Sequence, residues 1–495
     1  MLFEMNRVLM CRNHPVLEFA YSSNAGFILE VGDVFDPSRV PVGMYVDGQP
    51  RPDSDSVTAW WRSRGIPATR DGLRTLLMAT GIPSGKELLD RSMGLSLSDQ
   101  YWIRPAGMDT LRWEDLNFFH NDFDERLGKA LFTGDSSRIG DVNTPDVTSA
   151  GDLPKRWIIR DDGVRTLIKA GRSGQEPDNE RIAWKTARLL GIDHVEYRVG
   201  RINGARVSAC DEMLSDTEEL IPAGQIMRIF RKGGYRERRD IWVEACQRLG
   251  VDRDTIMHAT DDFLFLDFLL RNTDRHYNNF GLIRDVESFA IRPAPIYDSG
   301  ASLWNGMDPD AMDNGDYRTK PFWTDQWGEE DNAYWQLSLI DDWDRYDLGV
   351  LDDVPDIVHE QLFHGASAFV LNNTQRQFFK PFLQSRPQAE QRVISCFMRE
   401  IQAPAIEKSL QHQTYQDQYD MLDDKGSSDC LPHDQRCNYL ICQHKGKNTQ
   451  QNTDQHDGCC SIEAFFMRSG IFKYFLEHKS NLLSCEISVS YTHLR

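Results

Sequence analysis

Two residues of one loop, Asp274 and Asn279, have the types and the spacing that suit phosphoryl transfer. They form a D-x-x-x-x-N pair, in which the aspartate orients the attacking hydroxyl and the asparagine binds a metal ion. A second carboxylate, Asp298, follows just before Gly300. Because Mg²⁺ prefers oxygen ligands and keeps several waters, one aspartate, one asparagine and the nucleotide phosphates suffice to hold it. The spacing predicts catalysis by Asp274 and metal binding by Asn279 and Asp298, although a polar turn explains the pair alone equally well.

The segments on either side of this loop are predicted to hold it in place. Residues 252–270 contain no glycine and carry a broad apolar face, which predicts a helix that anchors the loop in the core. Strand-like segments follow at residues 281–286 and 288–297. Together they predict a hairpin that delivers Asp298 next to the loop.

A lysine on a predicted strand and a glutamate on a predicted helix form the next candidate pair. Residues 165–169, RTLIK, alternate as a strand does, and the helix that follows is predicted to begin at a cap supplied by Asp178 or Asn179. This start places Glu180 in the first turn. In kinases a strand lysine and a helix glutamate together hold the α- and β-phosphates, so Lys169 and Glu180 are predicted to do so here. The alternative is a surface lysine and a glutamate favoured by the helix dipole.

The segment just before this strand could bind phosphate through its backbone. Residues 148–152 are small and polar, and such a loop can bring N–H groups up to phosphate oxygens. We name Ser149 and Gly151 as candidate nucleotide contacts. Without its context, a plain hairpin explains the loop better.

A second hairpin is predicted around the turn Asn203-Gly204, a strong signal for two antiparallel strands. Its second strand runs into Cys210–Met213, where a linker between two lobes would lie. The backbone of such a linker could hold an adenine ring, and Cys210 and Glu212 are the candidates for this contact.

The composition limits the classes of protein and of partner. The chain has 495 residues, a formal net charge of −20 and 40% hydrophobic residues, which is enough for several domains with large cores. The negative charge disfavours non-specific nucleic-acid binding and anionic membrane surfaces. No apolar run approaches the roughly 18 residues of a membrane-spanning helix, and four scattered cysteines in the first 400 residues fit reduced thiols. We therefore expect a cytoplasmic protein.

Shifts in pattern divide the chain into four predicted regions. Residues 1–140 combine alternating apolar segments with a helical stretch broken at Pro67, which predicts an α+β subdomain. Residues 141–215 hold the predicted strands and the lysine–glutamate pair. Residues 216–405 are mainly helical and carry the catalytic loop. Residues 406–495 form a separate tail.

The tail is rich in Gln, Asp and His and has little apolar periodicity, so disorder is predicted. Six of the ten cysteines fall here, which makes a zinc site conceivable, although no C-x-x-C pair supplies a metal knuckle. The last residues, SVSYTHLR, resemble translated library-adapter sequence, and we hold the hypothesis that the end is a cloning or frameshift artefact. The same codons in an independently sequenced copy of the locus would refute it.

The motifs around the loop resemble those of the HipA-type serine/threonine kinase family. Members carry an N-x-D-x-H-x-x-N-x-G loop and an aspartate after a Pro-x-Tyr-like strand end, which here read NTDRHYNNFG and PIYDSG. The matching residues are Asn272, Asp274, His276, Asn279, Gly281, Tyr297 and Asp298. The resemblance extends back to the loop at Thr148–Lys155, to Lys169 and to Asn179-Glu180, and it covers about residues 143–400.

This resemblance implies an α+β, two-lobed protein-kinase-like fold, ATP with Mg²⁺ as cofactors, and phosphate transfer to a serine or threonine of a protein. It implies that Asp274 is catalytic, that His276 braces the loop, and that Glu180 supports Lys169 at the phosphates. It also implies that Thr148 or Ser149 is a site of inactivating autophosphorylation and that a small DNA-binding antitoxin is a partner.

Two alternatives to a protein kinase stay open. A phosphotransferase acting on a small molecule or a lipid would use the same motifs, because they report phosphate chemistry and not the acceptor. An inactive nucleotide-binding scaffold is the other alternative. At the phosphate-side loop the chain departs from the family pattern, since Asp152 and Leu153 replace small or amide residues.

Overall fold

The computed structural model of the chain describes residues 4–22, 25–133, 143–230, 238–307, 317–322, 333–337 and 339–364. The chain divides into two units, Met1–Ile340 with Asp347–Pro387, and Asp341–Tyr346 with Gln388–Arg495. All helices and strands named below belong to the first unit. In the second, Asp341–Tyr346 are described, and the rings of Trp343 and Tyr346 meet edge to face with centroids 6.3 Å apart. The predicted tail and its candidate zinc ligands lie outside the described residues.

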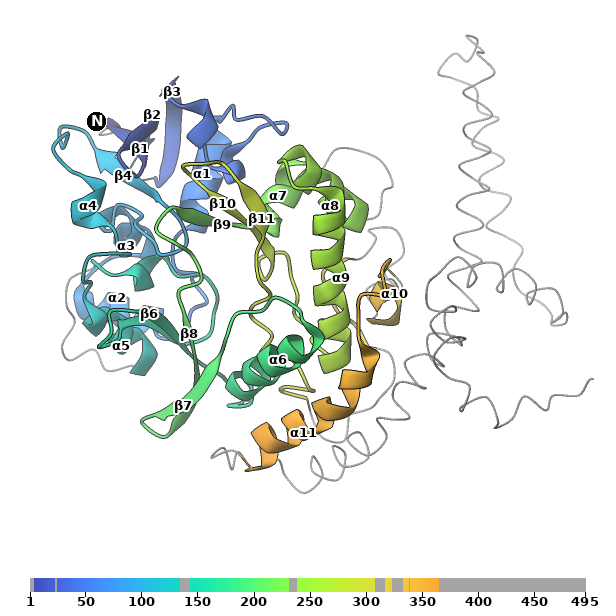
Figure 1. The fold of residues 1–495 in the computed structure, drawn as a ribbon. Coiled ribbons are helices and arrows are strands. Elements are labelled where there is room, and N and C mark those ends of the chain that lie inside the picture. The colour runs from blue at the N-terminus through green and yellow to red at the C-terminus, as the bar shows by residue number, and fades with distance from the viewer. Residues whose placement is uncertain are drawn as a thin grey trace, which may run out of the picture. The chain divides into compact units, whose positions relative to one another are not determined.

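Residues 4–133 build an antiparallel sheet with short helices around it. The strands, in the order β3-β2-β1-β4, are β1 (Glu4–Cys11), β2 (His14–Ser22), β3 (Phe27–Val34) and β4 (Tyr101–Pro105) (Figure 1). The first three correspond to the predicted alternating segments. The sequence alone does not mark β4 as a strand. It becomes one because Tyr101, Trp102 and Ile103 are buried where it pairs with β1.

The helices of this region start and stop where the local sequence directs. They are α1 (Ser54–Ser63), α2 (Leu73–Thr80), α3 (Gly85–Arg91), α4 (Trp113–Leu116) and α5 (Glu125–Thr133). Asp53 caps α1, because its carboxylate accepts a hydrogen bond from the Ser56 N–H at 2.7 Å. Pro67 lies between α1 and α2, so the predicted helical stretch is two helices.

A second antiparallel sheet carries the predicted lysine. Its order is β5-β6-β8-β7, from β5 (Lys155–Ile159), β6 (Arg165–Ala170), β7 (Arg198–Ile202) and β8 (Ala205–Asp211). The turn between β7 and β8 is the predicted Asn203-Gly204 pair, with φ of +50° and +82°.

The helix α6 (Glu176–Leu190) begins earlier than predicted. Gln175 is the residue before it, so the prediction that Asp178 or Asn179 caps the helix is wrong, and Glu180 lies beyond the first turn. Asp178 is instead buried inside the helix, where it accepts hydrogen bonds from Arg206 and Gln361. An aspartate with partners from distant segments has no need to serve as a local cap.

A third sheet, in the order β11-β10-β9, connects the N-terminal region to the catalytic loop. Its strands are β9 (Glu218–Pro222), β10 (Gly281–Asp285) and β11 (Ile291–Pro293), so the predicted hairpin forms with a shorter second strand. Arg284 of β10 is buried and donates to Glu219 of β9 and to the hydroxyl of Tyr101 on β4. This buried polar contact ties β4 to β9 and β10.

The remaining helices contact one another or α6. They are α7 (Ala223–Ile229), α8 (Arg238–Arg248), α9 (Arg253–Leu270), α10 (Ala333–Leu337) and α11 (Val354–His359), and α8 packs along α9 (Figure 1). Asp252 caps α9 through the Thr255 N–H at 3.0 Å, and the helix ends at Arg271, whose φ is +54°. In the described part of the chain, none of the helices has the length and apolar character needed to cross a membrane.

Candidate active site

Lys169 is the centre of an ionic cluster in which Lys169 and Glu180 are buried and Asp298 is partly exposed. Its ammonium Nζ donates to Glu180 Oε1 at 2.7 Å and to Asp298 Oδ1 at 3.0 Å. These three residues come from β6, from α6 and from the segment after β11. Glu180 also accepts a hydrogen bond from the hydroxyl of Ser208 on β8. The structure therefore brings together the predicted lysine, glutamate and metal aspartate.

The charges of this cluster favour the ionised forms of Lys169 and Asp298, whereas burial raises the pKa of Glu180. Burial lowers the pKa of Lys169, but Asp298 and Glu180 outweigh this and raise it well above its usual value. Burial raises the pKa of Asp298, but Lys169 and then Lys155 hold it well below its usual range.

The backbone at Asp298 adopts an uncommon conformation, with φ of +59°. Aspartate is among the few residues that enter this left-handed region readily. The conformation is stabilised on both sides, since Arg275 donates to the carbonyl of Tyr297 and, at 2.9 Å, to the hydroxyl of Ser299. The Asp298 N–H also donates to the hydroxyl of Tyr197 at 3.4 Å. These contacts turn the Asp298 carboxylate toward Lys169.

Asp274 and Asn279 are tied together within the catalytic loop. The Asn279 amide nitrogen donates to the Asp274 carbonyl at 3.0 Å. The Asp274 N–H donates to the Asn272 side chain at 3.1 Å, and Asn272 donates to Asp267 on α9 at 2.8 Å. The loop thus closes on itself and is anchored to the helix before it.

Arg275 is a structural anchor of the loop that the sequence analysis did not single out. Its side chain is fully buried and donates to both carboxylate oxygens of Asp267, at 2.7 and 2.8 Å, and to the Asn279 carbonyl at 2.8 Å. Together with its contacts at Tyr297 and Ser299, it joins α9, the catalytic loop and the Asp298 segment. An acidic residue in the apolar stretch before the loop was the available signal for such a partner.

The Asp274 carboxylate is 44% exposed. Lys320 Nζ donates to Asp274 Oδ1 at 2.7 Å, and His276 Nε2 lies 4.0 Å from Asp274 Oδ2. The hydroxyl of Thr319 donates to the Asn272 carbonyl at 2.8 Å, which fixes the Lys320 segment against the loop. Lys320 was missed because nothing in its local sequence links it to the motif. The backbone of His276 donates to the Asp274 carbonyl at 2.7 Å, so His276 is part of the loop's internal bonding.

Arg70, which precedes α2, donates hydrogen bonds to the phosphate-side loop. Arg70 is buried and donates to the carbonyls of Ser149 at 2.6 Å, Ala150 at 3.0 Å and Gly151 at 2.6 Å. Lys155 also donates to the Ala150 carbonyl. With its carbonyls facing these two cations, the loop has a defined backbone conformation.

The two hydroxyls expected to be phosphorylated are both turned inward. Thr148 donates to the Leu95 carbonyl at 2.8 Å, and Ser149 donates to the Asp146 carbonyl at 3.2 Å. Both side chains are buried. In this conformation neither hydroxyl is presented to solvent.

Cys210 lies inside β8, opposite Leu167 of β6, and not in a linker. Its thiol is buried beside Val195 and Tyr197, and burial raises its pKa to about 12. Glu212 is the first residue past the strand. Its N–H donates to the Arg165 carbonyl at 2.9 Å, and burial raises the pKa of its carboxyl to about 8. Pairing with β6 extends the strand by one residue past Cys210, so only Glu212 of this pair lies after the strand, and its contact with adenine stays a prediction.

The donor set fits a magnesium ion. Because the Asn279 nitrogen is engaged with the loop, its oxygen remains to coordinate a cation, as does the second oxygen of Asp298. Within the described ranges, no group of three His, Cys, Asp or Glu side chains could bind a metal alone.

Comparison with known proteins gives likeness in structure only. No family model and no curated protein sequence match the chain. HipA of Shewanella oneidensis MR-1, from a complex with HipB and operator DNA, is 14% identical with a TM-score of 0.47, over 76% of this chain and 95% of HipA. The proinflammatory kinase CtkA of Helicobacter pylori is 18% identical with a TM-score of 0.36, over 49% of this chain and 94% of CtkA. Both TM-scores are below 0.5, so these likenesses carry no argument about function.

Proposed function

We propose that the chain is an ATP- and Mg²⁺-dependent phosphotransferase of the HipA type, which moves the γ-phosphate of ATP to a serine or threonine hydroxyl of a protein. The observation that carries this proposal is the contact of buried Lys169 with both Glu180, at 2.7 Å, and Asp298, at 3.0 Å. In kinases the lysine–glutamate pair and the metal aspartate must both be in place for transfer. The spacing of Asp274 and Asn279 supplies the remaining groups.

Each side chain has a task in this reaction. Asp274 would accept a hydrogen bond from the acceptor hydroxyl, orient it in line with the γ-phosphate and take its proton. The new bond to the hydroxyl oxygen forms as the bond from the γ-phosphorus to the ADP oxygen breaks. Lys169 would hold the α- and β-phosphates, and Lys320, beside Asp274, would attract the γ-phosphate. When bound at Asn279 and Asp298, Mg²⁺ supplies positive charge to the phosphate oxygens.

The nucleotide would bind between the two predicted lobes, residues 141–215 and 216–405. Ser149 and Gly151 would offer backbone N–H groups to phosphate, because Arg70 and Lys155 already engage the carbonyls of this loop. The adenine would meet the backbone at Glu212. Since the Glu212 N–H is used by Arg165, its carbonyl is the group to contact the base.

The test is phosphotransfer by the purified full-length chain with γ-labelled ATP and Mg²⁺, beside its Asp274→Ala variant. Label on the chain or on an added protein, seen with the wild type and lost in the variant, supports the proposal. Melting curves of both proteins show whether the variant is folded. A folded Asp274→Ala protein with full activity would refute the role of Asp274.

The same assay separates the alternatives. Transfer to a small molecule or a lipid, but to no protein, would favour the second class of phosphotransferase. Binding of ADP without turnover would favour the inactive scaffold. Mapping label to Thr148 or Ser149 would test autophosphorylation, which requires this loop to leave its buried position. The antitoxin partner stays a prediction, tested by co-purification from native cells of a small DNA-binding protein.

A further inference from the structure

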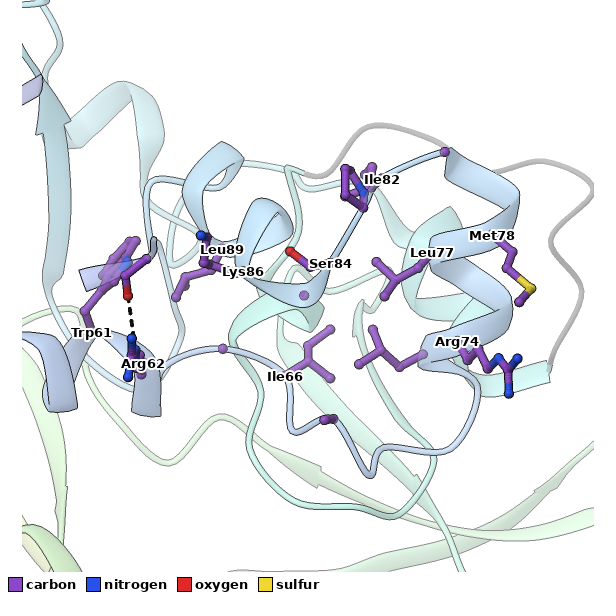
Figure 2. A pocket seen from close by; sticks show the side chains of 17 residues that line it. Trp61, Arg62, Ile66, Arg74, Leu77, Met78, Ile82, Ser84, Lys86 and Leu89 are labelled. Carbon is purple, nitrogen blue, oxygen red and sulfur yellow. Dashed lines mark hydrogen bonds between the residues drawn. The ribbon is translucent and has the colours of Figure 1, made fainter. Parts of the chain in front are cut away.

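A cavity of about 770 Å³ lies in the N-terminal region between α1, α2 and α3. Figure 2 shows Trp61 and Leu89 on one side of it, Ile66 and Ile82 along it, and Leu77 and Met78 of α2 on the other side. None of the residues that line it belongs to the phosphotransfer site. Its volume lies in the range of small-molecule sites, which are concave and mostly apolar.

The charged residues that line this cavity are all cationic. They are Arg62, Arg74 and Lys86, and no aspartate or glutamate lines it, although the chain has 76 acidic and 56 basic residues. Figure 2 shows Arg62 beside Trp61 at one end and Arg74 beside Met78 at the other. Although the chain is acidic, the lining of this cavity therefore carries positive charge only, which favours an anionic ligand.

The two arginines keep donors available for a ligand. Arg62 uses its Nε to donate to the Gly26 carbonyl at 3.1 Å, while its terminal nitrogens make no hydrogen bond to the described residues (Figure 2). Arg74 is exposed and forms no hydrogen bond or ion pair within the described part of the chain. A guanidinium group pairs well with a carboxylate, because its planar fork can donate two parallel hydrogen bonds.

The apolar surface near Arg74 is also open to solvent. The Met78 side chain is 70% exposed, more than any other large hydrophobic side chain in the described ranges. Leu77, beside it, packs against the buried cluster that includes Ile66, Leu73 and Ile82. An apolar body bound here would cover Met78 and extend that core.

We propose that this cavity binds a small organic anion with an apolar body, such as a carboxylate on an alkyl chain or an aromatic ring. The walls would bury the apolar body, and Arg74, at the Met78 end of the cavity, would pair with the anionic group. This site is independent of the proposed phosphotransfer, because binding needs neither nucleotide nor Asp274.

The test uses isothermal titration calorimetry of the full-length protein with decanoate and, as the matched cation, decyltrimethylammonium. Decanoate should bind at one site, and the cation should bind about tenfold more weakly, since charge-assisted hydrogen bonds are lost and like charges meet. Displacement of the aromatic anion 8-anilinonaphthalene-1-sulfonate by decanoate should show that both share the cavity.

Exposed positions supply variants that leave the fold intact. Arg74→Gln should weaken decanoate about tenfold, and Met78→Glu should weaken it further than Met78→Gln does. Arg51→Gln, an exposed arginine outside the cavity, should change nothing. Equal binding of the two decyl ions, no binding of either anion, or full binding by both Arg74→Gln and Met78→Glu would each overturn the proposal.

Discussion

Replacing Arg70 is the strongest test of the proposed nucleotide site. Arg70 is distant from the phosphate-side loop in the chain but binds it directly. It donates to three consecutive carbonyls, those of Ser149, Ala150 and Gly151, at distances of 2.6, 3.0 and 2.6 Å. Replacing Arg70 by glutamine removes the fork that makes these contacts together. The loop would then have to be ordered when the nucleotide binds.

The size of the effect follows from these hydrogen bonds. A hydrogen bond to a charged group contributes about 1.5–3 kcal/mol net. Water replaces part of what is lost, because the loop carbonyls become solvated, so we assign the variant the value of one such bond. A loss of about 1.5 kcal/mol corresponds to roughly a tenfold rise in the Kd for ADP. Arg70→Lys should lie between wild type and Arg70→Gln, since it keeps the charge but not the fork.

The assay is calorimetric titration of ADP with Mg²⁺ into wild type, Arg70→Gln and Arg74→Gln. Arg74 is exposed and makes no contact with the loop, which makes it the matched control. Melting curves establish that each variant is folded. A folded Arg70→Gln protein that binds ADP within about twofold of wild type would refute the argument. If wild type binds no nucleotide, the proposed function itself is wrong.

Three further outcomes are expected. Asp298→Asn should move the Mg²⁺ midpoint of transfer about tenfold higher; an unchanged midpoint in a magnesium titration contradicts its metal role. Arg275→Met should lower the free energy of unfolding in urea by about 3–5 kcal/mol, because it leaves the buried Asp267 carboxylate without its partner. Arg292→Gln, which removes an exposed pair, should lower it by under about 1 kcal/mol. Equal losses would show that the buried pair stabilises the fold no more than the exposed one. Burial, as the larger cause, and the charge of Lys169, as the next, lower the pKa of Lys155 to about 8. The Lys155 ammonium therefore loses its charge as the pH rises through that value. The kcat/KM for ATP should fall above about pH 8 and stay level in Lys155→Arg; the same fall in both proteins would assign it to another group.

Local patterns in the sequence predicted most of the elements around the site. The Asn203-Gly204 turn, the helix before the catalytic loop and the hairpin after it all occur as expected, because each depends on residues close together in the chain. The start of α6 was predicted wrongly. There the polar residue expected to cap the helix, Asp178, has distant partners, so tertiary contacts override the local signal.

Local sequence patterns did not predict the residues that hold the site in place. Arg70 and Lys320 belong to segments without a motif of their own, and Arg275 lies within the NTDRHYNNFG segment but is not one of its matching positions. Arg70 meets the phosphate-side loop across 79 to 81 positions of the chain, and Lys320 meets Asp274 across 46. Such pairs depend on how the elements pack, and one sequence contains no direct signal of that packing.

The groups available for chemistry, and the contacts within one loop, can be read from the order of residues along the chain. Asp274 and Asn279 lie five residues apart, so the bond between them follows from local backbone geometry. The contact of Lys169 with Asp298, which lies 129 positions away, depends on the packing of the elements. That contact requires β6, α6 and the segment after β11 to pack together, because a side chain reaches only a few ångströms and chain spacing says nothing about distance in space.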